Sequence, residues 1–146
     1  EVADLVTPQA QNRHVQIKLD QSRPEPALIV GDRDLLKQAL LNVAMNGIEA
    51  MKNAGELEMR IYRKFDDYVV SITDEGVGIP PEVQDKIFNL YFSTKPEGSG
   101  IGLAVTFRVV QLHNGTINFD SEVGRGTCFR LHFPASHQQG MQQEVA

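Results

Sequence analysis

The sequence predicts an α/β (α+β) two-layer sandwich, in which a mixed, mostly antiparallel sheet of about five strands carries three helices on one face. Two patterns support this fold class. Several short segments alternate apolar and polar residues, as half-buried strands do, and longer segments repeat apolar residues at mixed intervals of three and four, as amphipathic helices do. With 146 residues, 41% hydrophobic and 23% charged, the chain is long enough for one core and has the composition of an ordinary globular domain.

The first part of the chain is expected to contribute two helices and two strands. Residues 1–12 are weakly helical, and the alternation over 15–19 predicts a strand. After two prolines, 27–30 reads as a second strand, and Asp32 is placed to cap a long amphipathic helix that reaches about Met51. The apolar face of this helix is expected to pack against the sheet.

The second part is expected to form two antiparallel strand pairs, separated by a loop rich in glycine and proline. The predicted elements are, in order, a hairpin of 57–61 and 68–72, a mobile loop over 75–102 with a short helix near 81–88, a helix over 102–113, and strands 116–120 and 127–133. We expect one domain over 1–134, followed by a disordered tail over 135–146.

Charge and cysteine content exclude several classes of protein. The net charge of −5 disfavours nucleic-acid binding, and no apolar run approaches the roughly 18 to 20 residues of a membrane-spanning helix. Cys128 is the only cysteine, which excludes an internal disulfide and a thiolate zinc site; inside a predicted strand, it is expected to be a small core residue. We expect a cytoplasmic domain, and its start at Glu1 instead of Met is consistent with a fragment of a longer, membrane-anchored protein.

A cluster of glycines over 98–102 immediately precedes the helix predicted from Leu103. Free backbone N–H groups and the positive end of the helix dipole can hold phosphate oxygens there, because glycine permits close approach. Neither of the familiar phosphate-loop patterns is present. The cluster alone is also compatible with a simple turn.

Asp74 stands where an apolar strand ends and the glycine-bent segment 75–80 begins. A carboxylate in this position can accept a hydrogen bond from an exocyclic amine, which contributes about 1.5 to 3 kcal/mol and favours adenine over guanine. Taken in isolation, a capping or turn aspartate is the better explanation of the same residue.

Asn42, Asn46 and Glu49 lie along one stripe of the long predicted helix. Asparagine is a poor helix former, so two on a face rich in Leu and Ala suggest a use, such as offering a carbonyl oxygen to Mg²⁺. A neutral ligand holds Mg²⁺ weakly, so phosphate oxygens and water would complete its coordination. The alternative is that both amides are solvated surface groups.

Together these segments resemble, in order, the boxes of the catalytic domains of sensor histidine kinases. The resemblance covers about 32–134 and rests on 42–46, 74–78, 88–92, 98–102 and 126–127. It implies the Bergerat-type ATP-binding fold shared with gyrase, heat-shock chaperones and mismatch-repair ATPases. By the same resemblance, Asn46 would bind Mg²⁺, Asn42 would lie beside the phosphates, and Asp74 would accept the adenine amine.

The resemblance also implies roles for the loops around the base and the phosphates. Gly76 and Gly78 would shape the base pocket, and Thr127 would lie near the adenine and support Asp74. Phe88 and Phe92 would hinge a lid. The remaining nucleotide-contacting positions would be Ile79, Gly98, Ser99, Gly100, Ile101, Gly102 and Leu103.

Three departures from the family pattern affect the expected chemistry. The ATPase branches have a glutamate that activates water where this chain has Asn42, which favours transfer to a protein nucleophile over hydrolysis. Many relatives have Lys or Arg at the position of Glu49, so Lys95 in the short lid is our candidate for the charge that faces the phosphates. Gly47 replaces the usual alanine at a cost of up to ~1 kcal/mol in helix propensity.

We therefore expect the ATP- and Mg²⁺-binding half of a protein histidine kinase. Its partners would be its own dimerisation and phosphoacceptor domain and a response regulator; the isolated domain is expected to be a monomer and the full-length protein a homodimer. No histidine has the context of a phosphoacceptor, because the four are predicted in a strand, at a helix end or in the tail: His14, His113, His132 and His137. The alternatives are a stand-alone serine kinase of the anti-sigma type and a non-catalytic nucleotide-binding interaction module.

Overall fold

The computed structural model describes residues 1–20, 28–52, 54–89, 92, 102–136 and 143–144. Its centre is a five-stranded sheet in the order β1-β3-β4-β6-β5, in which β1 pairs with β3 in parallel and the other pairs are antiparallel. The strands are β1 (Val15–Asp20), β3 (Gly55–Lys64), β4 (Asp67–Asp74), β5 (Thr116–Glu122) and β6 (Gly126–Pro134).

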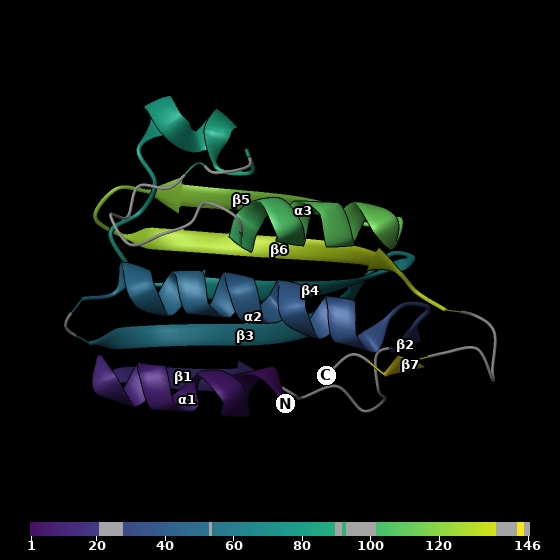
Figure 1. The fold of residues 1–146 in the computed structure, drawn as a ribbon, viewed down its shortest axis with the longest axis horizontal. Helices are drawn as coiled ribbons and strands as arrows, with labels where there is room; N and C mark the ends of the chain where they lie inside the picture. The colour runs from purple at the N-terminus through teal and green to yellow at the C-terminus, as the bar shows by residue number, and fades with distance from the viewer. Residues whose placement is uncertain (21–27, 53, 90–91, 93–101, 137–142, 145–146) are drawn as a thin grey trace.

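Three helices cover one face of this sheet (Figure 1). They are α1 (Val2–Asn12) over β1, α2 (Arg33–Ala50) beside β3 and β4, and α3 (Gly102–Leu112) beside β5 and β6, with a short 3₁₀ helix, η1 (Pro81–Lys86), in the loop after β4. The predicted mixed sheet with three helices on one face is therefore confirmed. Among the described residues, no helix is long and apolar enough to cross a bilayer.

The segment predicted as a second strand differs from the expectation. β2 (Leu28–Ile29) is two residues long and lies outside the main sheet, where it pairs antiparallel with β7 (Gln143–Glu144). The sheet edge beside β3 is occupied by β1, and Gly31 packs so closely on the end of α3 that an added Cβ would lie 2.4 Å from the ring of His113. Most of the tail expected over 135–146 lies outside the described residues, although Ala135 is buried and β7 pairs with β2.

The core lies between the helices and the sheet. Three neighbouring strands each contribute an apolar stripe on the helix-facing side: Val70 and Ile72 from β4, Phe129, Leu131 and Phe133 from β6, and Ile117 and Phe119 from the edge strand β5. At the end of each stripe, the next residue on the same face is polar: Asp74, Thr127 and Ser121. The register places Thr127 opposite both Asp74 and Ser121, so the three form one polar row across β4, β6 and β5.

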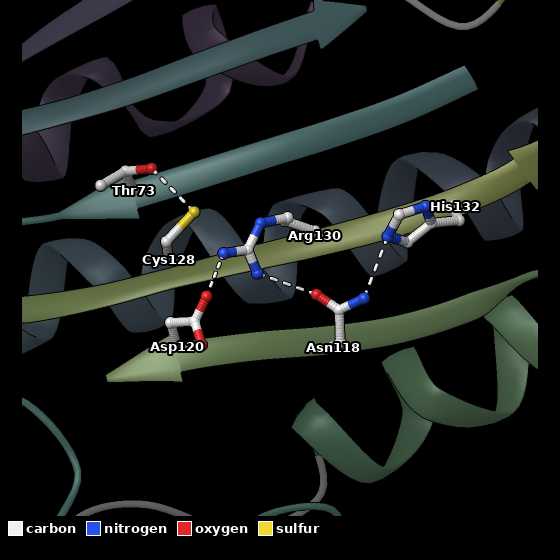
Figure 2. Close-up of polar contacts among 6 residues, drawn as sticks. All are labelled: Thr73, Asn118, Asp120, Cys128, Arg130 and His132. Atoms are coloured by element: carbon white, nitrogen blue, oxygen red, sulfur yellow. Dashed lines mark hydrogen bonds and ion pairs between the residues drawn. The ribbon is translucent and has the colours of Figure 1, made fainter. Parts of the chain in front are cut away.

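The other face of the sheet carries a polar network (Figure 2). Arg130 donates to Asn118 at 2.9 Å and forms an ion pair with Asp120, while the Asn118 amide donates to His132 Nε2 at 3.0 Å. Cys128, expected in the core, lies half-buried on this face and accepts a hydrogen bond from the Thr73 hydroxyl at 3.1 Å. Strand alternation explains this correction, because its neighbours on both sides face the helices.

His113 joins the start of α2 to the end of α3. The backbone N–H of Asp32 donates to His113 Nε2 at 2.9 Å, so the proton of the neutral ring resides on Nδ1, which donates to the carbonyl of Val109 at 2.7 Å. The Asp32 side chain is the N-cap of α2, and its Oδ1 accepts from the N–H groups of Asp34 and Leu35 at 2.9 and 3.1 Å.

Replacing the N-cap of α2 should lower the free energy of unfolding of the domain. Asp32→Ala removes the side-chain acceptor and keeps the backbone N–H, so we expect the free energy of unfolding to fall by about 1 kcal/mol. Asp32→Ser is the matched control, because serine retains an oxygen that can accept the same bonds. Urea unfolding measures both, and equal losses in the two variants would contradict the capping role.

Candidate functional site

The polar row ends at Asp74, the last residue of β4. Its side chain is buried, with 5% of the residue exposed, and Oδ1 accepts hydrogen bonds from the N–H groups of Gly76 at 2.8 Å and Thr127 at 3.2 Å. Oδ2 accepts no hydrogen bond from the described residues. Burial raises the pKa of the Asp74 carboxyl above its ordinary 3.8, although the two backbone N–H groups oppose the shift. The described part of the chain therefore holds one carboxylate oxygen and leaves the other able to accept a further hydrogen bond.

Gly47 lets α2 pack closely beside that second oxygen. A Cβ at this position would lie 3.3 Å from Asp74 Oδ2 and 2.7 Å from Leu57 Cδ1. The helix therefore approaches the carboxylate without a side chain in between. This close approach explains why the chain tolerates a glycine that costs up to ~1 kcal/mol in helix propensity.

The loop after Asp74 passes between α2 and the turn that joins β5 to β6. A Cβ on Gly76 would lie 2.7 Å from the carbonyl oxygen of Ala50, which accepts a hydrogen bond from the Val77 N–H at 3.1 Å. Gly78 has φ +78°, and a Cβ there would lie 2.3 Å from the carbonyl oxygen of Glu122. Both glycines are therefore required for the close packing of the backbone, which brings the loop over the polar row. Their role in a base pocket stays a prediction.

Ser121 belongs to the site and was missed by the sequence reasoning. Its Oγ accepts from the Ile79 N–H at 2.8 Å, lies 2.8 Å from Thr127 Oγ1, and lies 3.2 Å from the carbonyl oxygen of Gly126. Its position in β5 could have indicated it. Ser121 follows Ile117 and Phe119 in the alternating pattern, so a polar residue stands at a position that is expected to face the core.

Asn42 connects α2 to the first residue of α3. Its Nδ2 donates to the carbonyl oxygen of Gly102 at 3.2 Å, and its Oδ1 accepts from Gln38 Nε2 at 3.0 Å. The fully buried hydroxyl of Thr106 lies 3.0 Å from the same Gly102 oxygen and 3.3 Å from the carbonyl oxygen of Ala39. The last glycine of the cluster thus lies against the asparagine-bearing helix, and its role in phosphate binding stays a prediction.

Other predicted site residues are partly placed by the structure. Asn46 is half-buried one turn beyond Asn42 and immediately precedes Gly47, where the helix passes Asp74, while Glu49 is exposed. Leu103 packs against the core from the start of α3. The remaining phosphate and lid candidates lie outside the described residues: Lys95, Gly98, Ser99, Gly100 and Ile101.

The aromatic residues predicted to hinge the lid are attached to the core. The ring of Phe88 lies 5.3 Å from that of Phe107 in a stacked arrangement and 6.0 Å from that of Phe119. Phe92 also packs against the core cluster. The segment after η1 is therefore anchored to both α3 and β5, and the hinge role stays a prediction.

A family model matches most of the chain and identifies its family. A family model described as "Histidine kinase-, DNA gyrase B-, and HSP90-like ATPase" matches residues 31–137. The chain belongs to this family. The matched residues include all the described elements that form the site, from α2 to β6.

Curated relatives match nearly the whole chain. The sensor protein DegM of Bacillus sp. (strain B21-2) is 37% identical over 134 residues, which cover 92% of this chain and 35% of DegM. The sensor histidine kinase ZraS of Escherichia coli (strain K12) is 37% identical over 132 residues, which cover 90% of this chain and 28% of ZraS. The chain thus spans about a third of the length of these relatives.

Solved structures share the fold of this family member. A crystal structure of full-length ShkA in complex with AMPPNP has a TM-score of 0.83 at 29% identity, with 92% of this chain and 28% of that chain covered. A nucleotide-free catalytic domain of the histidine kinase ThkA has a TM-score of 0.81 at 26% identity, with 91% and 87% covered. The predicted two-layer architecture is therefore that of histidine kinase catalytic domains.

The raised pKa of Asp74 predicts a specific pH dependence of stability. The folded state binds a proton more readily than the unfolded chain, so the contribution of Asp74 to stability is greatest below pH 3.8 and is lost as the pH rises through the raised pKa. Asp74→Asn does not ionise. We therefore expect the stability of the variant relative to the wild type to increase with pH over this window, as measured by urea unfolding at several pH values. A difference that is independent of pH would contradict this prediction.

Proposed function

We propose that this chain is the Mg-ATP-binding catalytic domain of a two-component sensor histidine kinase, and that it transfers the γ-phosphoryl group to a histidine on the dimerisation domain of that kinase. The observation that carries the proposal is the buried carboxylate of Asp74, with Oδ1 held by two backbone N–H groups and Oδ2 left to accept from a ligand. The names of the relatives support it, since DegM is a sensor protein and ZraS a sensor histidine kinase.

Asp74 would select adenine by its hydrogen-bonding pattern. The exocyclic amine of adenine is a donor, while the corresponding group of guanine is an acceptor that a carboxylate repels. Gly47 places no side chain over Oδ2, and Thr127 lies next to Asp74 in the polar row. The structure of ShkA with AMPPNP, an adenine nucleotide bound to a related chain, is consistent with this assignment.

The phosphates would lie at the start of α3. Backbone N–H groups at a helix N-terminus favour phosphate oxygens, and Asn42 already contacts the Gly102 carbonyl there. We assign the nearby glycines of 98–102 to the same task and Lys95 to the charge that faces the transferring group. These assignments rest on the family resemblance and on the position of Gly102.

Asn46 is our candidate ligand for Mg²⁺. Within the described part of the chain, no group of three or more His, Cys, Asp or Glu side chains is arranged to hold a metal ion. An amide oxygen on α2 is a hard ligand of the kind that Mg²⁺ accepts, and phosphate oxygens and water would supply the remaining positions. When bound, the metal would neutralise charge on the β- and γ-phosphates.

Asn42 suits transfer to histidine better than hydrolysis. An amide cannot remove a proton from water, whereas a neutral imidazole nitrogen has a lone pair and needs no such activation. In the transfer, an N–P bond forms as the bond between the γ-phosphorus and the bridging oxygen breaks, and ADP leaves. We place the domain in the cytoplasm, with its phosphoacceptor domain and a response regulator as partners and a homodimer as the full-length assembly.

Asp74→Asn tests nucleotide binding directly. The amide presents a donor toward the adenine amine and removes a charge-assisted hydrogen bond worth about 1.5 to 3 kcal/mol, so we expect affinity for Mg-ATP to fall roughly 10- to 150-fold in calorimetry. Glu75→Gln is the matched control: this neighbouring carboxylate is exposed and accepts from the Glu56 N–H at 2.6 Å, away from the row. Unchanged binding by Asp74→Asn would eliminate the proposed base site, and absence of binding by the wild type would favour a non-catalytic module.

Asn46→Ala tests the metal role and the reaction. We expect the variant to bind ATP normally without Mg²⁺ and to lose phosphoryl transfer from labelled ATP to a histidine-bearing dimerisation domain supplied in trans, because the metal ligand is gone. The wild-type phosphoprotein should be labile in acid, as phosphohistidine is. Equal transfer by the variant would remove Asn46 from the metal site, and an acid-stable product would point to the serine kinase alternative.

A further inference from the structure

The polar network on the face of the sheet opposite the helices is not used by the proposed function. It connects β6 to the edge strand β5 and consists of His132, Asn118, Arg130 and Asp120 (Figure 2). The register places Asn118 opposite Arg130, so its side chain bridges Arg130 and His132 from the neighbouring strand. The network therefore adds side-chain contacts to the backbone pairing that holds β5 in the sheet.

Only one arrangement of donors and acceptors fits these contacts. A guanidinium can only donate, so Arg130 Nη1, which lies 2.9 Å from Asn118 Oδ1, fixes the orientation of the Asn118 amide. The amide nitrogen then faces His132 Nε2 at 3.0 Å. Because an amide nitrogen can only donate, Nε2 must accept. The His132 ring is therefore neutral, and its proton lies on Nδ1.

A proton on His132 Nε2 is incompatible with this arrangement. The N–H of the imidazolium would face the N–H of the Asn118 amide, which places two donors against each other. Rotation of the amide by half a turn would offer its oxygen to His132, but it would turn its nitrogen toward Arg130, which is also a donor. Uptake of the proton therefore breaks one of the two contacts of Asn118, whichever way the amide lies.

The charged groups around His132 come from four strands: Lys64 from β3, Asp67 from β4, Asp120 from β5 and Arg130 from β6. Burial is the main reason that the pKa of the His132 imidazole lies below its ordinary 6.5. Asp67 opposes this shift, and Lys64 and Arg130 reinforce it. Asp120 forms an ion pair with Arg130. The surroundings therefore favour the neutral ring that the hydrogen bonds require.

We propose that Asn118 and His132 form a pH-sensitive link between β5 and β6, which is closed while the imidazole is neutral and opens when the ring takes up a proton. Acid then loosens the edge strand and places a second positive charge beside Arg130. On its helix-facing side, β5 carries Ser121, which holds the Ile79 N–H, so the link acts on a strand that borders the candidate site. Neither the link nor its test requires a bound nucleotide.

Nitrogen NMR of the His132 ring tests the link directly, because the ring shifts distinguish the two neutral tautomers. At about pH 7.5 we expect the Nδ1–H tautomer, and we expect a titration midpoint below 6.5. Asn118→Leu keeps the ring covered but removes the donor. The midpoint should then rise by roughly 0.4 to 1 pH unit, as for the loss of one hydrogen bond to the neutral ring.

Thr116→Val is the matched control for this titration. It changes the β5 side chain directly opposite His132 and leaves Asn118 in place, so the midpoint should keep its wild-type value. A general effect of altering β5 would instead move the midpoint in Thr116→Val and Asn118→Leu alike.

Urea unfolding shows whether opening of the link destabilises the domain. His132→Gln is the matched variant, because its amide oxygen can accept from Asn118 at every pH and does not titrate. The contribution of His132 to stability is complete above pH 6.5 and is lost as the pH falls through the lowered pKa, since the unfolded chain binds the proton more readily. We therefore expect the stability of the wild type relative to His132→Gln to decrease in acid. The comparison cancels the titration of Asp74, which both proteins share.

Three results would overturn the link. They are an Nε2–H tautomer in the wild type, a midpoint that Asn118→Leu leaves unchanged or lowers, and a stability difference between wild type and His132→Gln that is independent of pH. The tautomer is measured on the wild type alone, so it decides the question even if a variant fails to fold.

Discussion

The hydrogen bonds to one oxygen of Asp74 are the interaction on which the site depends. Burying a carboxylate is costly unless donors compensate it, and here two backbone N–H groups reach Oδ1. One comes from Gly76, which is held by its close packing on the end of α2, and the other from Thr127, which the register of β6 places opposite Asp74. The loop and the sheet therefore converge on a single atom, while the other oxygen, near which α2 passes at Gly47, accepts no hydrogen bond from the described residues.

Local patterns in the sequence predict most of the fold and part of the site. Alternation locates the strands of the main sheet, and Asp32 caps α2 as expected. Asp74 and Asn42 could be singled out because a carboxylate at a strand end and an amide on an apolar helix are locally unusual. The pairing of β2 with β7 could not, since it joins two-residue strands far apart in the chain, and no local pattern encodes such a contact.

Ser121 shows why the rest of the site escapes prediction from sequence. A serine in a half-exposed strand is ordinary, and it gains significance only when the register brings it beside Thr127 and the loop brings the Ile79 N–H onto its oxygen. Gly47 is a similar case. In the sequence it is only a residue of low helix propensity, whereas in the structure its missing side chain allows α2 to pack closely against Asp74. Both residues act through non-local contacts, which composition and periodicity do not record.

The neutral imidazole of His113 has a mechanical consequence for the two long helices. It ties the beginning of α2 to the end of α3, at the opposite end of both from Asn46 and Gly102. The Thr106 hydroxyl lies 3.3 Å from the Ala39 carbonyl oxygen midway along the pair, and Asn42 bonds the Gly102 carbonyl at the start of α3. The two helices are therefore joined at three levels, so a substitution that loosens one contact leaves two others to keep their spacing.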